Sequence, residues 1–160
     1  GDLHPGNCII DTDGKFVFID NGAICHAPSH VNGALFHFFE QLSNRQFSEA
    51  YDALLAMSDS QLDGRRLAKY YAKMDEIYAG FETKPVGEQS LTRVMMLTVR
   101  AAVEKAGADF GEEAFPIIRA LMYLDGLVIR SHPDVMLIES MGPYLKEFRT
   151  GLGIGGETTA

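Results

Sequence analysis

Three polar residues near the N-terminus, Asp2, Asn7 and Asp20, have the types and spacing that magnesium-dependent phosphoryl transfer requires. Asp2 and Asn7 form a D-x-x-x-x-N pair in the opening segment GDLHPGN, and Asp20 follows the apolar run KFVFI. In this chemistry one aspartate accepts or orients the proton of the attacking hydroxyl. An asparagine and a second aspartate hold the metal against the β- and γ-phosphates of ATP. Because Mg²⁺ prefers hard oxygen ligands and keeps some of its waters, one amide and one carboxylate oxygen suffice.

The segment CIIDTDGKFVFID, at 8–20, predicts a β-hairpin that brings Asn7 next to Asp20. Two short apolar runs flank Asp13-Gly14, and Asp-Gly between such runs is a strong hairpin signal. Taken singly, each element has a plainer interpretation. A D-x-x-x-x-N pair is common by chance, and Asp-Asn-Gly at 20–22 is also good turn chemistry. The joint order of loop, asparagine, strand, turn, strand and aspartate favours the metal site.

Apolar residues recur at helical spacing beyond Pro28, which predicts a helical body over 28–150. The clearest helix face comprises Phe47, Ala50, Tyr51, Leu54 and Leu55. A later helix at 112–130 is apolar on nearly all sides, which predicts a place at the centre of the core. Gly142-Pro143 predicts a kink or break in the last helix, and the Gly-rich segment 151–160 predicts a flexible tail. We therefore expect one domain, mainly α with a small N-terminal β-hairpin (α+β).

Composition excludes several classes of function. The chain has 160 residues and a net charge of −8, which argues against a nucleic-acid partner, because such binding needs clustered Lys and Arg. Two cysteines, Cys8 and Cys25, are too few for a disulfide framework or a four-ligand zinc site and indicate free thiols. No apolar run reaches the roughly 18 residues of a membrane span.

The chain resembles the AarF/UbiB family of atypical kinases, a group linked to coenzyme Q (ubiquinone) biosynthesis. The resemblance rests on GDLHPGN followed by CIIDTDGKFVFIDNG, and on two helical segments, LSNRQFSEAYDALLAMSD and LMYLDGLVIRSHPDVMLIESMGPYL. It implies the C-terminal lobe of a protein-kinase-like fold at 1–150, with a catalytic loop at 1–7 and a metal-binding hairpin at 8–22.

Residue by residue, the resemblance gives Asp2 the catalytic role and makes Asn7 and Asp20 ligands of Mg²⁺ and thereby of ATP. His4 is expected to shape the loop as a structural residue. Asn21 stands where protein kinases have Phe, which removes the aromatic packing that locks this segment in ordinary kinases.

The resemblance also implies parts and partners that this sequence does not contain. The family has an upstream Lys-x-Gly-Gln segment, and no such segment occurs here. We therefore expect a missing N-terminal lobe of the same protein, a nucleotide, and a lipid or isoprenoid substrate or a membrane surface as partners. The isolated chain is expected to be inactive. The expected location is intracellular: the mitochondrion in a eukaryote, or the cytoplasm or inner-membrane face in a bacterium.

Two alternatives stay open at this point. One is a small-molecule phosphotransferase of the aminoglycoside or choline kinase type, although those enzymes usually carry Gly-Asp-Pro soon after the second metal aspartate, where AICHAPSHVNG stands here. The other is a non-catalytic pseudokinase scaffold. An Asp-Phe-Gly triplet at 109–111 follows a predicted helix end rather than a strand, and Asp109 with Glu112 predicts a helix N-cap instead.

Overall fold

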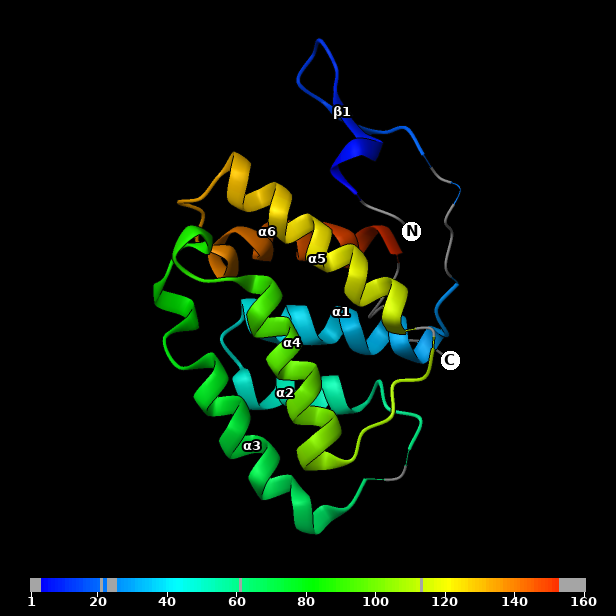
Figure 1. The fold of residues 1–160 in the computed structure, drawn as a ribbon, viewed down its shortest axis with the longest axis vertical. Coiled ribbons are helices and arrows are strands. Elements are labelled where there is room, and N and C mark those ends of the chain that lie inside the picture. The colour runs from blue at the N-terminus through cyan, green and yellow to red at the C-terminus, as the bar shows by residue number, and fades with distance from the viewer. Residues whose placement is uncertain (1–3, 21, 23–25, 61, 113, 153–160) are drawn as a thin grey trace.

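The computed structural model describes residues 4–20, 22, 26–60, 62–112 and 114–152. Within these ranges the chain is mainly helical, with one two-stranded antiparallel sheet near the N-terminus. The hairpin projects from one end of the helical body, above α5 and α6 (Figure 1). The helices are α1 (Ser29–Ser43), α2 (Phe47–Leu55), α3 (Gly64–Tyr78), α4 (Leu91–Ala101), α5 (Ala114–Ser131) and α6 (Leu137–Leu152).

The predicted hairpin is confirmed, with shorter strands than the apolar runs suggest. Strand β1 (Cys8–Ile10) pairs with β2 (Phe16–Phe18) so that Cys8 lies opposite Phe18. The Asp11 carboxylate organises the turn, because its Oδ1 accepts hydrogen bonds from the backbone N–H groups of Asp13 and Lys15 at 2.9 and 2.8 Å. Gly14 has a φ of +78°, a left-handed conformation that favours glycine. The turn therefore fixes the pairing register.

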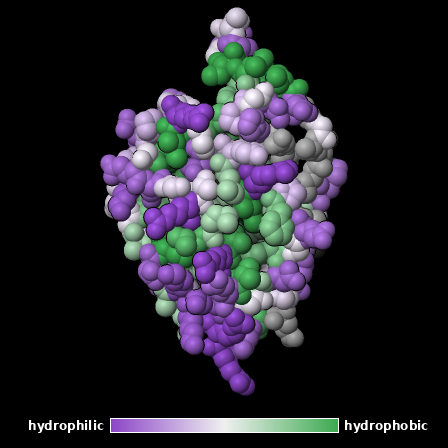
Figure 2. Space-filling view, in the orientation of Figure 1, coloured by the Kyte–Doolittle hydropathy of each residue, from purple (hydrophilic) through white to green (hydrophobic). Residues whose placement is uncertain are grey.

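The hairpin buries little of its apolar surface. The side chains of Ile10, Phe16 and Phe18 are 71%, 48% and 43% exposed. Hydrophobic residues accordingly gather on the projecting end of the molecule (Figure 2). A two-stranded hairpin without a covering layer is marginally stable in water.

Three of the largest fully buried side chains lie on α2 and α3. Tyr51, Tyr70 and Met74 are almost completely buried, and the Tyr70 hydroxyl donates a 2.9 Å hydrogen bond to the backbone oxygen of Tyr51. The helix face predicted over 47–55 is confirmed, because Ala50, Tyr51, Leu54 and Leu55 are buried there and Phe47 packs against the same core. Helix α3 begins after Asp63, whose Oδ1 accepts from the N–H of Arg65 at 3.0 Å.

The prediction that the helix at 112–130 occupies the centre of the core is wrong. In α5, Ala114 and Asp125 are the buried residues, and the side chain of Phe115 is 71% exposed. Some apolar residues of this helix face a cavity between the helices, and others face the outer surface. A helix that is apolar on all sides is therefore not necessarily at the centre of the core. Helix α6 continues through Pro143 and reaches Leu152, into the predicted tail; 153–160 lie outside the described residues.

Among the helices of the described ranges, none combines the length and apolar composition that crossing a bilayer requires.

We predict that stability falls steeply at alkaline pH because of the buried tyrosines. Burial raises the pKa of Tyr78 to about 12, and it raises the pKa values of Tyr51 and Tyr70 further. An unfolded tyrosine ionises near pH 10. The stabilising contribution is therefore complete below about pH 10 and is lost as the pH rises toward 12. Urea midpoints measured by circular dichroism should fall across this window, and Tyr78→Phe should make the fall shallower. Urea midpoints that stay constant from below pH 10 up to pH 12 would contradict this.

We also predict that the hairpin is labile while the core between α2 and α3 is protected. Hydrogen exchange of the amides at 9–10 and 16–18 should be much faster than exchange at Tyr70 and Met74, because the strands lack a covering layer. Equal protection of the two regions would show that the hairpin is stable without further support.

Candidate functional site

The structure places Asn7 and Asp20 at the same end of the hairpin. Asn7 ends a 3₁₀ turn, Pro5–Asn7, directly before β1, and Asp20 follows β2 by two residues. The backbone N–H of Ile19 donates a 2.9 Å hydrogen bond to the backbone oxygen of Asn7, which extends the ladder by one position. Backbone pairing thus places Asn7 opposite Ile19, the residue before Asp20, and metal binding by the two side chains stays a prediction. Asp2, the expected catalytic residue, lies outside the described residues.

His4 shapes the loop that leads to Asn7. Its Nδ1 accepts a hydrogen bond from the N–H of Gly6 at 3.1 Å, and its backbone oxygen accepts from the N–H of Asn7 at 2.8 Å. The imidazole ring also meets the ring of Tyr123 on α5 edge to face, with centroids 5.5 Å apart. The expected structural role of His4 therefore agrees with its contacts, which tie the loop to the helical body.

The Asp20 side chain is exposed, and the turn that follows it orients its carboxylate. Oδ1 accepts a 2.8 Å hydrogen bond from the N–H of Gly22, and a Cβ at position 22 would lie 3.0 Å from the same oxygen. Glycine at 22 therefore permits the close approach of backbone and carboxylate. This hydrogen bond is typical of a turn, which is the plainer interpretation of Asp-Asn-Gly at 20–22. Asn21 itself lies outside the described residues.

The donor set at this end of the hairpin fits Mg²⁺ in its chemistry. Asn7 offers an amide oxygen and Asp20 a carboxylate, both hard donors, and the backbone of Asn7 is bonded to that of Ile19, the residue before Asp20. Magnesium is commonly held by one or two protein carboxylates together with water and phosphate oxygens, because it demands a regular octahedron and dehydrates reluctantly. A site with few protein ligands beside an open face suits that preference.

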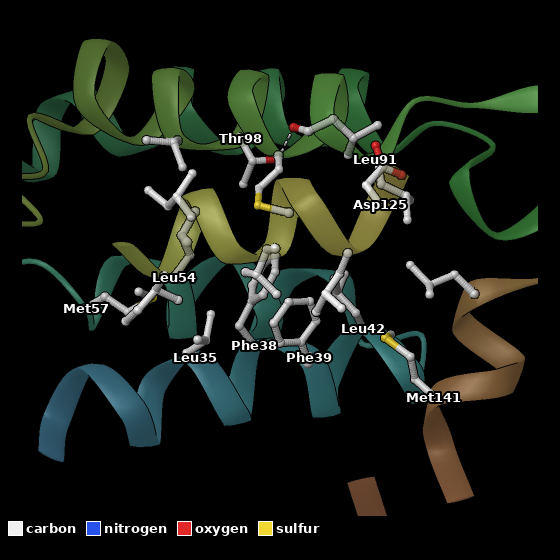
Figure 3. Close-up of a pocket in the computed structure, with 18 of the residues that line it drawn as sticks. Leu35, Phe38, Phe39, Leu42, Leu54, Met57, Leu91, Thr98, Asp125 and Met141 are labelled. Atoms are coloured by element: carbon white, nitrogen blue, oxygen red, sulfur yellow. Dashed lines mark hydrogen bonds between the residues drawn. The ribbon is translucent and has the colours of Figure 1, made fainter. Parts of the chain in front are cut away.

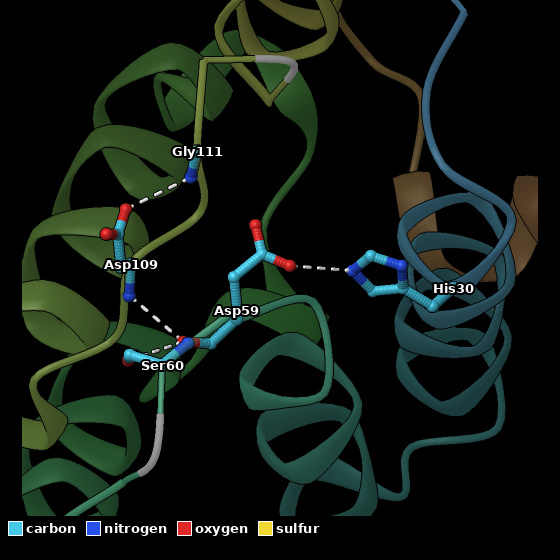
Figure 4. A network of polar contacts seen from close by, with 6 residues as sticks. His30, Asp59, Ser60, Asp109 and Gly111 are labelled. Atoms are coloured by element: carbon cyan, nitrogen blue, oxygen red, sulfur yellow. Dashed lines mark hydrogen bonds and ion pairs between the residues drawn. The ribbon is translucent and has the colours of Figure 1, made fainter.

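The Asp-Phe-Gly triplet at 109–111 has a structural role away from the hairpin (Figure 4). The backbone N–H of Asp109 donates to Ser58 Oγ at 2.9 Å, and its backbone oxygen accepts from the N–H of Asp59 at 2.8 Å. Asp109 Oδ1 accepts from the N–H of Gly111 at 3.1 Å. The predicted N-cap role of Asp109 is therefore wrong, because its carboxylate turns back on its own loop and α5 begins only at Ala114.

Sequence reasoning gave no role to Asp125, although it is the one buried charged side chain in the described part of α5. Its Oδ2 accepts hydrogen bonds from the N–H and the hydroxyl of Thr92 at 2.8 and 2.6 Å, at the start of α4. An anion is favoured at a helix N-terminus, so this carboxylate fastens α5 to α4. The available signal was an acidic residue within an otherwise apolar helix.

Comparison with known proteins gives two distant relatives. The chain is 24% identical over 158 residues to an Arabidopsis thaliana protein named "Protein ACTIVITY OF BC1 COMPLEX KINASE 3, chloroplastic"; the match covers 89% of this chain and 20% of that protein. It is 23% identical over 159 residues to an uncharacterized protein of Synechocystis sp., with 90% and 21% covered. No family model and no solved structure matches. The chain thus spans about a fifth of the length of these relatives, and nearly all of it is distantly similar to a protein named as a kinase.

Proposed function

We propose that this chain is the C-terminal lobe of an atypical kinase or ATPase of the AarF/UbiB type, dependent on ATP and Mg²⁺. The observation that carries the proposal is the adjacency of Asn7 and Asp20 at one end of the hairpin, set by the bond from Ile19 to Asn7. The distant similarity to a protein named as a kinase supports the same reading, because it covers most of this chain.

The proposed roles follow the chemistry of the side chains. Asn7 and Asp20 would hold Mg²⁺, and the bound metal would neutralise charge on the β- and γ-phosphates of ATP. Asp2 would accept or orient the proton of the attacking hydroxyl. His4 would position the loop through Gly6 and Tyr123 rather than take part in the reaction.

The partners and the location are part of the proposal. The exposed apolar hairpin would be covered by the N-terminal lobe of the same protein, a proposal that fits a chain spanning about a fifth of its relatives. We infer a role in ubiquinone or isoprenoid-lipid metabolism, at a lipid substrate or a membrane surface. An intracellular location is proposed, and the chloroplastic designation of the Arabidopsis relative fits an organelle.

We predict that Mn²⁺, a paramagnetic substitute for Mg²⁺, binds beside Asn7 and Asp20. In nuclear magnetic resonance spectra of residues 1–160 with ATP, Mn²⁺ should broaden the amide signals of Asn7, Asp20 and Gly22 before those of the turn at 11–15. Asp20→Ala should abolish the selective broadening, because it removes the carboxylate ligand. In the complete protein the same change should reduce ATP turnover on the order of 10²-fold or more, since a metal ion supplies several kcal/mol to such reactions.

A matched control lies at the other end of the same hairpin. Asp13 is also exposed, and its side chain is far along the strands from Asn7. Asp13→Ala should leave both the broadening and the turnover unchanged. Broadening that follows Asp13 instead of Asp20 would overturn the metal assignment. Metal binding without turnover in the complete protein would favour the pseudokinase scaffold.

A further inference from the structure

A cavity of about 390 Å³ lies inside the helical body, away from the hairpin. Figure 3 shows side chains from α1, α4, α5 and α6 around it, with Leu54 and Met57 closing one side. Its walls are almost entirely hydrocarbon; Phe38 and Leu42 project from α1, and Met141 from α6. The volume falls within the roughly 300–1,000 Å³ typical of small-molecule sites.

Asp125 is the charged residue among the described residues that line this cavity, where Tyr78 and Thr98 contribute hydroxyl groups. Its side chain lines the cavity and is 5% exposed. Thr92 satisfies Oδ2 with two short hydrogen bonds, so the carboxylate is held in one orientation. Oδ1 is buried without a hydrogen-bond partner among the described residues. A buried carboxylate oxygen without a donor is unfavourable and unusual in a folded protein, which calls for an explanation.

Helix α5, which carries Asp125, packs incompletely against its neighbours. Leu121, Leu124 and Val128 of α5 line the cavity and are only partly buried. Apolar walls that face an unfilled space lose dispersion contacts that close packing would supply. A molecule that filled the space would restore those contacts, and a donor group on it would satisfy Asp125.

We propose that this cavity binds an apolar molecule that ends in a hydroxyl group, with the hydroxyl donating a hydrogen bond to Asp125. The size follows from comparison with a cavity of about 150 Å³, which holds one benzene ring. A space about two and a half times as large accommodates roughly 15 non-hydrogen atoms. The negative charge of Asp125 selects against an anionic head group, because two like charges would be buried together. This site is separate from the proposed metal site and does not depend on it.

Methionine methyl groups report occupancy directly. With ¹³C-labelled methionine in residues 1–160, 1-decanol should shift the methyl signals of Met57 and Met141, which line the cavity. The methyl of Met74, which is fully buried outside the cavity, should not move. Decanoate, with the same chain length and a carboxylate head, should bind about tenfold or more weakly at neutral pH. Equal binding of alcohol and acid, or methyl signals of Met57 and Met141 that do not move, would overturn the proposal.

Two variants separate the roles of charge and space. Asp125→Asn should reduce the preference for decanol over decanoate toward unity, because it removes the charge that repels the acid. Leu124→Phe should weaken decanol binding at least about fivefold by filling the cavity, as added volume in a packed site costs free energy. Leu127→Phe on the same helix lies outside the lining and should leave binding unchanged. Unaltered decanol binding in Leu124→Phe would contradict the assignment, and the selectivity of the unmodified chain tests it even if a variant fails to fold.

Discussion

Burial of three tyrosines, with polar groups at their tips, holds the helical body together. The ring centroids of Tyr51 on α2 and Tyr78 on α3 lie 5.7 Å apart. Tyr51, Tyr70 and Tyr78 are each nearly inaccessible to solvent. Large aromatic rings contribute much of the apolar area in such a core, but a buried hydroxyl needs a partner. Tyr70 donates to the backbone of Tyr51, and the Tyr78 hydroxyl lies 3.1 Å from Thr98 Oγ1 on α4. The same cluster therefore joins α3 to α4 and gives the remaining helices a fixed support.

Helix α5 is attached to that support by polar contacts more than by close packing. Asp125 caps the start of α4 through Thr92, and the segment after α5 pairs by backbone with the 3₁₀ turn Val86–Glu88, where Gly87 donates to Pro133 at 2.7 Å. A Cβ at Gly87 would lie 2.9 Å from Pro133, so glycine is needed for this close approach. These contacts hold the second half of α5 and the segment that follows it, whereas Leu121, Leu124 and Val128 face the cavity, which explains why an apolar helix is only partly buried.

Local features of the fold could be predicted from the sequence, whereas features that depend on distant packing could not. The hairpin and the face over 47–55 follow from period and turn residues, and the adjacency of Asn7 and Asp20 follows from the hairpin. The burial of α5 could not be predicted, because hydrophobicity on all sides does not state which neighbours are present. The contacts of Asp109 and Asp125 join segments far apart in the chain, at Ser58 and Thr92. No local pattern encodes those pairings.

The candidate metal site depends on the turn of the hairpin and on its attachment to α5. Because side chains alternate along a strand, a slip of one residue would reverse the faces of β2 and give Asn7 a partner other than Ile19, the residue before Asp20. Asp11 and Gly14 prevent that slip by fixing the turn. Tyr123, which contacts His4, and Asp125, which lines the cavity, are two residues apart and so point about 200° apart around α5. One face of this helix therefore supports the loop before Asn7 while the opposite face closes the cavity, and the seating of α5 sets the position of both.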